Sequence, residues 1–560
     1  MFFFSITRNS IKLLIKNCNE IIHSNFFFTY ITDNFLSSFR STNHSFQIVE
    51  SLHPYIYNTE NYYFVKLDLN TKEKKLTIHK TLVAGRPVYY HINKNGEFFC
   101  TTHIKYFRTV NIILDENTKV IPELFLFRTV MPPFTIYKNI MQLTTGSHLI
   151  LSFENDKCNI NAIDQFQLPD IDYSINNIGT AAKQTYHLLE NTFKYLSLFK
   201  NNTSLLFSGG IDSSTLACLG KKNIQLNNTY STSYPFEEEK FNRERIYPNS
   251  AAKKIEVKNN HYICTPIDYF YGIIDSIYNC EEPVHHFQSI LIHLLFKNCT
   301  PAFFNIILSG QGAASSYGNL ASDVYYIEKN LIRKCIKKGF YRLSNNKAFF
   351  QPMLLPIDHV DHPLWKWKSY GLISWINNYF NTNKHEILSN RINFINSLQY
   401  KSIYNIWSYY SLVAYEDSTM YLWSKIAEAN QKILYYPYYD DKLLSYVLSI
   451  PWEIKLKLPH RILVRELAKL SSVPKFIIKR PQGNFGLVTN RWAIPGGYFE
   501  NILPIIYKII PKNELNILQS TDSRKNMTLW NALNYAIWKR IFIFNESPDD
   551  LKKELKSYMV

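Results

Sequence analysis

The chain has 560 residues, of which 46% are hydrophobic and 19% are charged. This balance excludes a largely disordered protein, and the length predicts about two to four domains. No run of about eighteen apolar residues occurs, so neither a membrane span nor a membrane partner is expected.

The formal net charge of +17 would suit a polyanionic partner. Asn, Ile, Lys, Phe and Tyr are all abundant, however, which indicates a general codon bias, and a nucleic-acid partner is therefore not expected. The eight cysteines stand singly, without the spacing of paired metal ligands or of a secreted disulfide scaffold. Residues 1–10 lack the long apolar stretch of a signal peptide, so a cytoplasmic protein is predicted.

The N-terminal part of the sequence is rich in short apolar and aromatic runs separated by polar breaks. Strands are predicted at residues 62–67, 76–78, 88–92 and 97–100. The turn Asn93-Lys94-Asn95-Gly96 predicts a hairpin between the last two. Residues 155–173 are polar and irregular, which predicts a domain boundary there. We therefore expect one domain over residues 1–165 and a second over residues 175–560.

Apolar runs typical of buried parallel strands occur in the second half, and helical patterns lie between them. Residues 180–198 predict a helix, and residues 203–207 and 302–308 predict strands. Alternating helices and strands favour a parallel, doubly wound sheet. Beyond about residue 329 the pattern becomes mostly helical and rich in aromatic residues, which predicts a helical layer over one side of that sheet.

The predicted strand 203–207 runs into the loop Ser208-Gly209-Gly210-Ile211-Asp212-Ser213-Ser214. Two glycines let the backbone approach an anion closely, and the residues that follow open a helix whose N-terminus attracts phosphate. No lysine follows the glycines, so this is not the G-x-x-x-x-G-K-S/T phosphate loop. The segment resembles the S-G-G-x-D-S-S/T loop of the ATP-pyrophosphatase superfamily, which implies ATP binding. The alternative is a tight strand-to-helix turn capped by Ser and Asp.

Later segments resemble the asparagine synthetase group, which includes beta-lactam synthetase and the lasso-peptide cyclases. They are Ser309-Gly310-Gln311-Gly312-Ala313 at an S-G-x-G-A/S-D-E turn, Tyr436-Pro437-Tyr438-Tyr439-Asp440 at a P-F/Y-x-D segment, Arg461-Ile462-Leu463-Val464-Arg465 at K-x-x-L-R, and Lys479-Arg480-Pro481-Gln482-Gly483 at the closing R-x-K-x-G-F loop. Gly85-Arg86-Pro87-Val88-Tyr89-Tyr90 resembles the G-x-R-P-L-Y-Y strand of the class II glutaminase domain. The resemblance implies an α/β chain, with an N-terminal Ntn-type, glutaminase-like αββα sandwich and a C-terminal ATP-pyrophosphatase domain with a parallel sheet and a helical layer.

The same resemblance implies a set of site residues, with ATP and Mg²⁺ as cofactors. The residues expected to bind ATP are Leu206, Ser208, Gly209, Gly210, Asp212, Ser213, Ser214, Ser233, Ser309 and Gly310. The residues expected to act in catalysis are Gln311, Arg461, Arg465 and Arg480. Asp212 is the expected metal ligand, because carboxylate oxygens suit Mg²⁺.

The sequence departs from the group at three places. Phe2 stands where a class II glutaminase carries its nucleophilic cysteine, so ammonia from glutamine is not expected. Ala314 and Ser315 stand where the group carries Asp-Glu, whose Asp helps to hold magnesium. Gln482 replaces the lysine that neutralises the charge of the departing pyrophosphate. Arg461 and Arg480 could partly compensate, because guanidinium groups bind phosphate well.

The leading functional hypothesis is an asparagine synthetase-like amide ligase that forms an acyl-adenylate and releases pyrophosphate. Its expected partners are a small-molecule or peptide carboxylate and an amine nucleophile, with closure of an amide within a natural product or a precursor peptide as the better-fitting form. One alternative is a pseudoenzyme that binds nucleotide or a partner without turnover. Another is an RNA-directed ATP-pyrophosphatase ligase, which the glutaminase-like N-terminal part opposes.

Overall fold

The structure is a computed structural model of the chain. It describes residues 2–7, 19–23, 26–32, 37–41, 45–51, 63–82, 85–154, 157–164, 166–234, 239–300, 305–313, 316–318, 356–362, 365, 369–398, 403–457, 459–480 and 489–558. Ala314, Ser315 and Gln482, three of the departures noted in the sequence, lie outside these residues.

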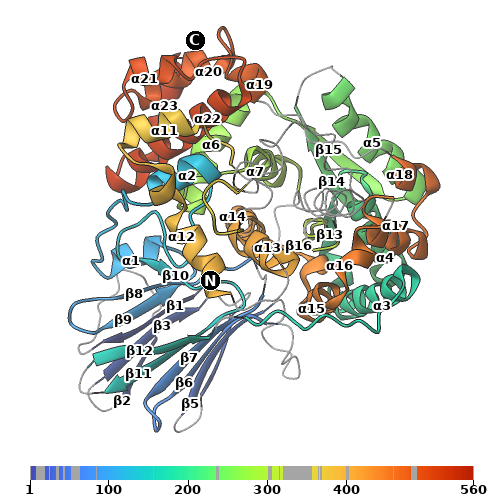
Figure 1. Ribbon diagram of the computed structural model, residues 1–560, viewed down its shortest axis with the longest axis horizontal. Coiled ribbons are helices and arrows are strands. Elements are labelled where there is room, and N and C mark those ends of the chain that lie inside the picture. Colours follow the sequence, from blue (N-terminus) through green and yellow to red (C-terminus); the bar gives the residue numbers. More distant parts are fainter. Residues whose placement is uncertain are drawn as a thin grey trace, which may run out of the picture.

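The N-terminal part forms two antiparallel sheets of six strands each (Figure 1). The first has the order β10-β8-β9-β1-β3-β2, with β1 (Phe2–Thr7), β2 (Asn19–His23), β3 (Phe26–Thr32), β8 (Tyr89–Ile92), β9 (Phe98–Thr101) and β10 (Met141–Gln142). The second has the order β12-β11-β7-β6-β5-β4, with β4 (Ser37–Ser41), β5 (Ser45–Ser51), β6 (Tyr63–Asn70), β7 (Lys75–Lys80), β11 (His148–Glu154) and β12 (Lys157–Asp164).

The two antiparallel sheets share an apolar core. Alternate residues of β7 and β11 are buried, so each strand turns one face inward. One hydrophobic cluster joins Ile6 and Phe98 of the first sheet with Leu67 and Leu149 of the second. The predicted hairpin is confirmed, because β8 and β9 pair antiparallel across the turn. The outer helical layers of the expected αββα sandwich stay a prediction.

The expectation of an irregular segment over residues 155–173 is wrong for its first half. Strand β12 occupies Lys157–Asp164 and pairs antiparallel with β11. It lies at the edge of its sheet and most of its side chains are exposed, so its residues are polar and carry no alternating pattern. Strands β1 to β5 were likewise not predicted from the sequence.

A parallel sheet of five strands forms the centre of the second half, as predicted. Its order is β15-β14-β13-β16-β17, with β13 (Thr203–Leu206), β14 (Asn228–Ser233), β15 (Lys258–Ile263), β16 (Asn305–Leu308) and β17 (Lys432–Tyr435), and all four pairings are parallel. Strands β13 and β16 confirm two predicted strands. Strand β17 is a four-residue strand within the region beyond residue 329, where the sequence pattern predicts mostly helices.

Helices surround the parallel sheet and extend it into a helical layer (Figure 1). The helices are α1 (Lys105–Thr109), α2 (Ile121–Phe127), α3 (Ile178–Leu196), α4 (Ile211–Ile224), α5 (Glu239–Ile255), α6 (Pro266–Cys280), α7 (Phe287–Cys299), α11 (Ile373–Phe380), α12 (Lys384–Ser397), α13 (Ile403–Ser411), α14 (Asp417–Ala429), α15 (Asp441–Ser449), α16 (Trp452–Lys455), α17 (Ile462–Leu470), α18 (Lys475–Lys479), α19 (Thr489–Trp492), α20 (Tyr498–Ile502), α21 (Lys512–Asn516), α22 (Ser523–Trp538) and α23 (Pro548–Tyr558). No helix among the described residues combines the length and apolar character needed to cross a membrane.

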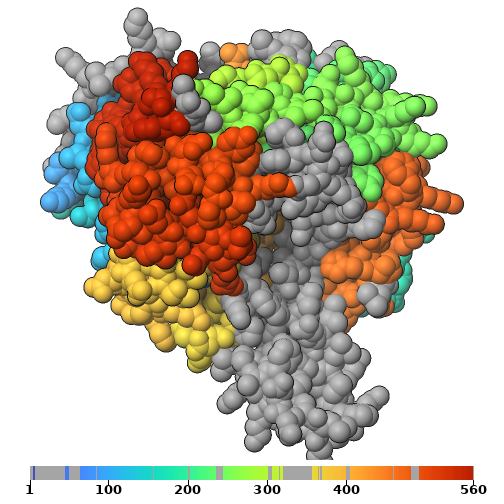
Figure 2. Space-filling view, turned by 90° about the horizontal axis from the view of Figure 1, so that it is seen from above, coloured from blue at the N-terminus to red at the C-terminus, as the bar shows by residue number. Residues whose placement is uncertain are grey.

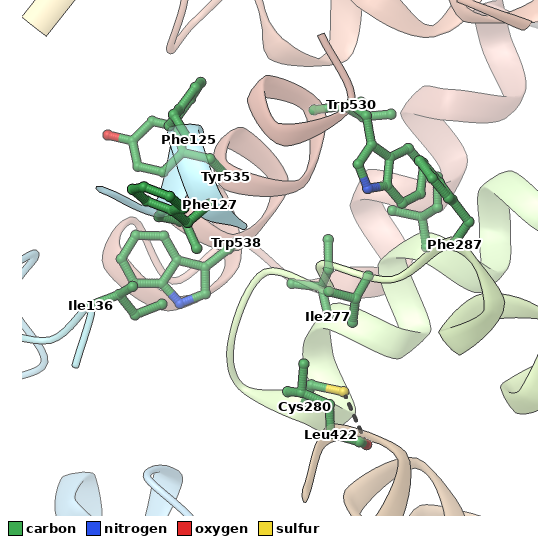
Figure 3. Close-up of a cluster of buried hydrophobic side chains, with 14 of the residues drawn as sticks. Phe125, Phe127, Ile136, Ile277, Cys280, Phe287, Leu422, Trp530, Tyr535 and Trp538 are labelled. Carbon is green, nitrogen blue, oxygen red and sulfur yellow. Dashed lines mark hydrogen bonds between the residues drawn. The ribbon is translucent and has the colours of Figure 1, made fainter. Parts of the chain in front are cut away.

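Helix α2 of the N-terminal part packs into the C-terminal helical layer. Figure 3 shows Phe125 and Phe127 of α2 beside Tyr535 and Trp538 of α22. The ring centroids of Phe125 and Tyr535 are 5.4 Å apart, in an edge-to-face arrangement that aromatic pairs favour. The aromatic residues that mark the second half of the sequence therefore form a core that the N-terminal part shares.

Candidate functional site

The loop from Ser208 to Ser214 leaves the carboxyl end of β13 and enters α4. Gly209 has a φ of +64°, and a Cβ atom there would lie 2.6 Å from the carbonyl carbon and oxygen of Tyr247 in α5. Only glycine satisfies both the backbone conformation and this close approach. The conformation brings the loop against α5 and leaves the N-terminus of α4 at the edge of the sheet.

The first turn of α4 presents backbone N–H groups without a capping side chain. Gly210 is the N-cap, and it supplies no side-chain hydrogen bond. Within the loop, the Ser208 N–H donates to Ser213 Oγ at 3.3 Å, and Ser213 Oγ donates to the Gly210 carbonyl oxygen at 3.3 Å. The buried Ser214 hydroxyl has no hydrogen-bond partner among the described residues. A helix N-terminus without a side-chain cap is suited to an anion such as phosphate.

A second loop follows β16 and touches the first. A Cβ atom at Gly310 would lie 3.1 Å from the Ser213 nitrogen, so the two loops are in close contact. The Ser309 N–H donates to the Tyr435 carbonyl oxygen of β17 at 2.9 Å. Gln311 donates from Nε2 to Glu416 Oε2 at 3.1 Å, which holds its side chain toward the helices. Both loops lie at the carboxyl ends of the parallel strands, where open α/β sheets bind ligands.

A cavity of about 250 Å³ opens between these loops, β14 and three helices. Its lining residues are Leu206, Phe207, Ser208, Asp212, Ser213, Tyr230, Ser231, Thr232, Glu244, Pro248, Gln288, Leu291, Ile292, Leu295, Ser309, Gly310, Gln311 and Trp423. Leu291, Ile292 and Leu295 of α7 form an apolar wall, and the serines of the two loops form a polar one. The pairing of an apolar wall with an anion cradle fits a nucleotide, with the base on the first and the phosphates on the second.

Arg461 lies at the carboxylate of Asp212. It is buried and caps α17 in the left-handed region, with φ of +61°. Its guanidinium forms an ion pair with Asp212 through Nη2, and the same nitrogen lies 3.4 Å from the Ala313 carbonyl oxygen. The Nε atom is buried and has no partner among the described residues. Arg461 therefore joins the two loops, and its Nε–H group remains available as a hydrogen-bond donor.

Arg480 reaches the same site from the end of α18. Its guanidinium stacks on the ring of Tyr247, with 3.6 Å between Cζ and the ring centroid, and Nη1 lies 3.5 Å from the Ser208 carbonyl oxygen. The segments around α5 and α18, distant in sequence, lie side by side, as the green and orange surfaces in Figure 2 show. Burial raises the pKa of Glu244, on the cavity wall, to about 7, and the charge of Arg480 opposes that shift.

Two of the expected site residues lie away from the cavity. Ser233 shares a hydrogen bond of 2.9 Å with His261 Nε2. Burial lowers the pKa of His261 to about 4, so the ring is neutral near pH 7. Arg465 donates to the carbonyl oxygen of His460, which precedes α17, and to that of Ile478 in α18, so its side chain connects these two helices.

The other expected residues are brought together by the structure. Leu206, Ser208, Asp212, Ser213, Ser309, Gly310 and Gln311 line the cavity. Gly209, Gly210 and Ser214 shape the loop behind it. The sequence interpretation missed Glu244, Gln288, Trp423 and the apolar wall of α7, because none of them stands in a motif.

The residues present fit ATP better than a magnesium ion held by carboxylates. The open N-terminus of α4 and the polar side chains of Ser208 and Ser213 at the cavity suit a phosphate. The Asp212 carboxylate, the expected metal ligand, is instead paired with Arg461. The described residues contain no group of three or more His, Cys, Asp or Glu side chains that could hold a metal.

Comparison with curated proteins finds no match. The family model described as asparagine synthase matches residues 185–318 and 371–534, which together make up more than half of the chain. The match takes in the parallel sheet and both loops of the cavity, and residues 1–184 lie outside it. The chain therefore belongs to the asparagine synthase family.

Proposed function

We propose that the protein is an ATP-dependent ligase that forms an amide bond. In the first step a carboxylate oxygen attacks the α-phosphorus of ATP, and the bond to pyrophosphate breaks, which yields an acyl-adenylate. In the second step an amine attacks the acyl carbon, AMP leaves and the amine loses a proton. The observation that carries the proposal is the cavity, in which an apolar wall faces the N-terminus of α4.

The proposed roles follow from where each side chain lies. The apolar wall of α7 is suited to the adenine base, and the first turn of α4 is suited to the phosphates. Arg461 and Arg480 supply the positive charge that stabilises the departing pyrophosphate, because guanidinium groups match phosphate oxygens well. Gln311 lines the cavity and can donate a hydrogen bond to a substrate carbonyl, although an amide cannot accept a proton at neutral pH.

We further propose that the amine belongs to the substrate and does not come from glutamine. Strand β1 (Phe2–Thr7) contains no thiol that could act as the nucleophile of a glutaminase. Cys100 lies on β9, beside β1, but it is fully buried, and burial raises the pKa of its thiol well above the ordinary value. A buried, protonated thiol is a poor nucleophile. The N-terminal sheets would then act as a scaffold, and closure of an amide within a small molecule or a precursor peptide fits this arrangement.

The test is a search for AMP and pyrophosphate. The purified full chain is incubated with ATP, with and without Mg²⁺, and with a panel of amino acids, dipeptides and short peptides that carry both a carboxylate and an amine. The proposal expects AMP and pyrophosphate in equal amounts, together with a product lighter by one water. Glutamate release from glutamine is expected to stay at the background level.

The second candidate is a nucleotide-binding protein without turnover. Two observations favour it, namely the replacement of charged residues of the group by Ala314 and Gln482 and the engagement of the Asp212 carboxylate with Arg461. ATP binding in the absence of AMP formation with every substrate of the panel would support this candidate over the ligase. Failure to bind ATP at all would contradict both.

A further inference from the structure

We infer that Arg461 takes the place of a metal ion at the phosphates, so that the protein binds ATP as the metal-free nucleotide. The inference rests on the proposed function, because it requires that the cavity binds ATP. It goes beyond that function because it assigns the positive charge beside the triphosphate to the Arg461 side chain and not to a bound metal ion.

The first observation is the ion pair between Arg461 and Asp212. The Arg461 side chain is only 9% exposed, and its guanidinium forms an ion pair with the Asp212 carboxylate. The guanidinium contacts Oδ1 of Asp212. A Mg²⁺ ion at the other carboxylate oxygen would lie beside the positive charge of Arg461, which repels it, and a Mg²⁺ ion at Oδ1 would have to displace the guanidinium. The structure thus already holds a cation at the position where the metal is expected.

The second observation is the way Arg461 is held. Its backbone adopts a left-handed conformation, and its Nη2 contacts both Asp212 of the first loop and Ala313 of the second. A non-glycine residue in this conformation is under strain, and such strain is common where a side chain must be positioned for a ligand. The guanidinium is therefore placed between the two loops that surround the anion cradle.

The third observation is the unused donor of Arg461. Its Nε is buried and lacks a partner among the described residues, and a buried donor without a partner is unfavourable. A phosphate oxygen in the cradle would satisfy it. Arginine offers several N–H groups in a planar fork, so it can keep Asp212 and still donate to phosphate.

The fourth observation comes from the residues after the second loop. Ala314 and Ser315 contain no carboxylate, so they cannot provide the second acidic ligand of a metal site. Arg480, stacked on Tyr247 above the first loop, adds a further positive charge on the same side. Arg480 thus brings a second guanidinium to the loop that the phosphates would contact.

The primary test compares ATP binding in EDTA with ATP binding in excess Mg²⁺, by calorimetric titration of the full chain. The two dissociation constants are expected to agree within about threefold, or to favour EDTA, because the guanidinium supplies the charge. Binding that is about tenfold or more tighter in Mg²⁺ would overturn the inference and leave the proposed function intact. No binding in either condition would overturn the proposed function and the inference with it.

Two substitutions distinguish a site that binds phosphate through Arg461 from a site in which Asp212 holds a metal ion. R461Q is expected to weaken ATP binding in EDTA by about tenfold or more. D212N is expected to bind ATP in EDTA at least as tightly as the parent chain, because it removes a negative charge beside the phosphates. If Asp212 held a metal, D212N would instead lose affinity in Mg²⁺ only, and this result would overturn the inference.

A matched control removes a positive charge from the same helix. Lys469 lies on α17, its side chain is 57% exposed, and it forms an ion pair with Glu466 on the surface. K469Q is expected to leave the dissociation constant unchanged within about twofold, because solvent and salt screen its charge. Thermal unfolding of every variant reports whether it is folded, and D212N decides the question if R461Q fails to fold.

Discussion

Lys425 and Glu281 form an ion pair that is shielded from solvent, with 2.9 Å between Nζ and Oε2 and exposed side-chain fractions of 2% and 0%. Glu281 also accepts the backbone N–H groups of Ile104 and Lys105, and Lys425 also donates to the hydroxyl of Tyr89 at 3.2 Å. The pair therefore joins α6 and α14 of the family-matched region to the N-terminal part. Its charges are compensated on several sides, which a buried ion pair requires.

Substitution of Lys425 by methionine is expected to destabilise the chain strongly. It leaves Glu281 buried without its cation, which typically lowers the free energy of unfolding by about 3–5 kcal/mol. Urea unfolding followed by circular dichroism measures the change. In the control K553M, the lost pair with Asp550 is exposed, at 79% and 70%, and a change below about 1 kcal/mol is expected. Equal losses in the two variants would contradict this account of the interface.

Substitution of Gly209 by alanine is expected to disrupt the nucleotide loop. The φ of +64° strains alanine, and its Cβ atom would lie 2.6 Å from the Tyr247 carbonyl group. Gly496 provides the control, because its φ is +76° but nothing lies within 4 Å of an added Cβ. G496A is expected to lose on the order of 1 kcal/mol of stability, and G209A about 1–3 kcal/mol more. G209A should also weaken ATP binding by about tenfold or more, whereas G496A should not.

Stacking of Arg480 on Tyr247 predicts a contribution of the ring to ATP binding. Y247L removes the face on which the guanidinium lies, and an exposed cation–π contact is worth about 0.5–1 kcal/mol, so affinity is expected to fall by about two- to fivefold. Y186L removes the ring beneath Lys222, at 5.7 Å, and is expected to leave ATP affinity unchanged. Calorimetric titration compares the two. Equal affinities would show that the stack does not position Arg480.

Glu244 predicts a pH dependence of nucleotide binding. Burial raises the pKa of its carboxyl to about 7, so the group is neutral below that pH and adds a negative charge to the cavity wall above it. Repulsion between this charge and the phosphates should weaken ATP binding as the pH rises from about 6 to about 8. E244Q is expected to remove this part of the pH dependence in ATP titrations. A pH profile that is the same in parent and variant would contradict the prediction.

The same carboxyl makes stability depend on pH. The folded state keeps the proton above the ordinary pKa of 4.5, which the unfolded chain follows, so the folded state binds more protons between pH 4.5 and about 7. The free energy of unfolding therefore falls as the pH rises through this window. E244Q should be more stable than the parent chain above about pH 7 and should lose that advantage near about pH 4. Thermal unfolding at a series of pH values measures the difference.

The parts of the fold that sequence predicted are those whose pattern is local. Strands β13 and β16 are buried on both faces and read as apolar runs, and Gly209 and Gly210 mark the loop that follows β13. The edge strand β12 has no apolar pattern to find, because its side chains face solvent. Strand β17 has only four residues between helical segments, so its run is too short to separate from a helix.

The sequence predicted the loops that form the site, but only some of the side chains that line it. Ser208, Asp212 and Ser213 of the motif line the cavity. Glu244 and Trp423 also line it, but they come from α5 and α14, and only the packing of the fold brings them there. The pairing of Arg461 with Asp212 likewise joins residues that lie 249 positions apart. Contacts of this kind depend on tertiary structure, which local spacing does not specify.

The central claim, that ATP binds at the loop between β13 and α4, is tested most directly by hydrogen exchange with mass spectrometry. ATP is expected to slow exchange of the amides from Ile211 to Ser213, because the first N–H groups of a helix have no partner within it and the phosphates would accept them, and to leave α23 unchanged as an internal control. Binding of ATP without slower exchange in this loop would contradict the claim.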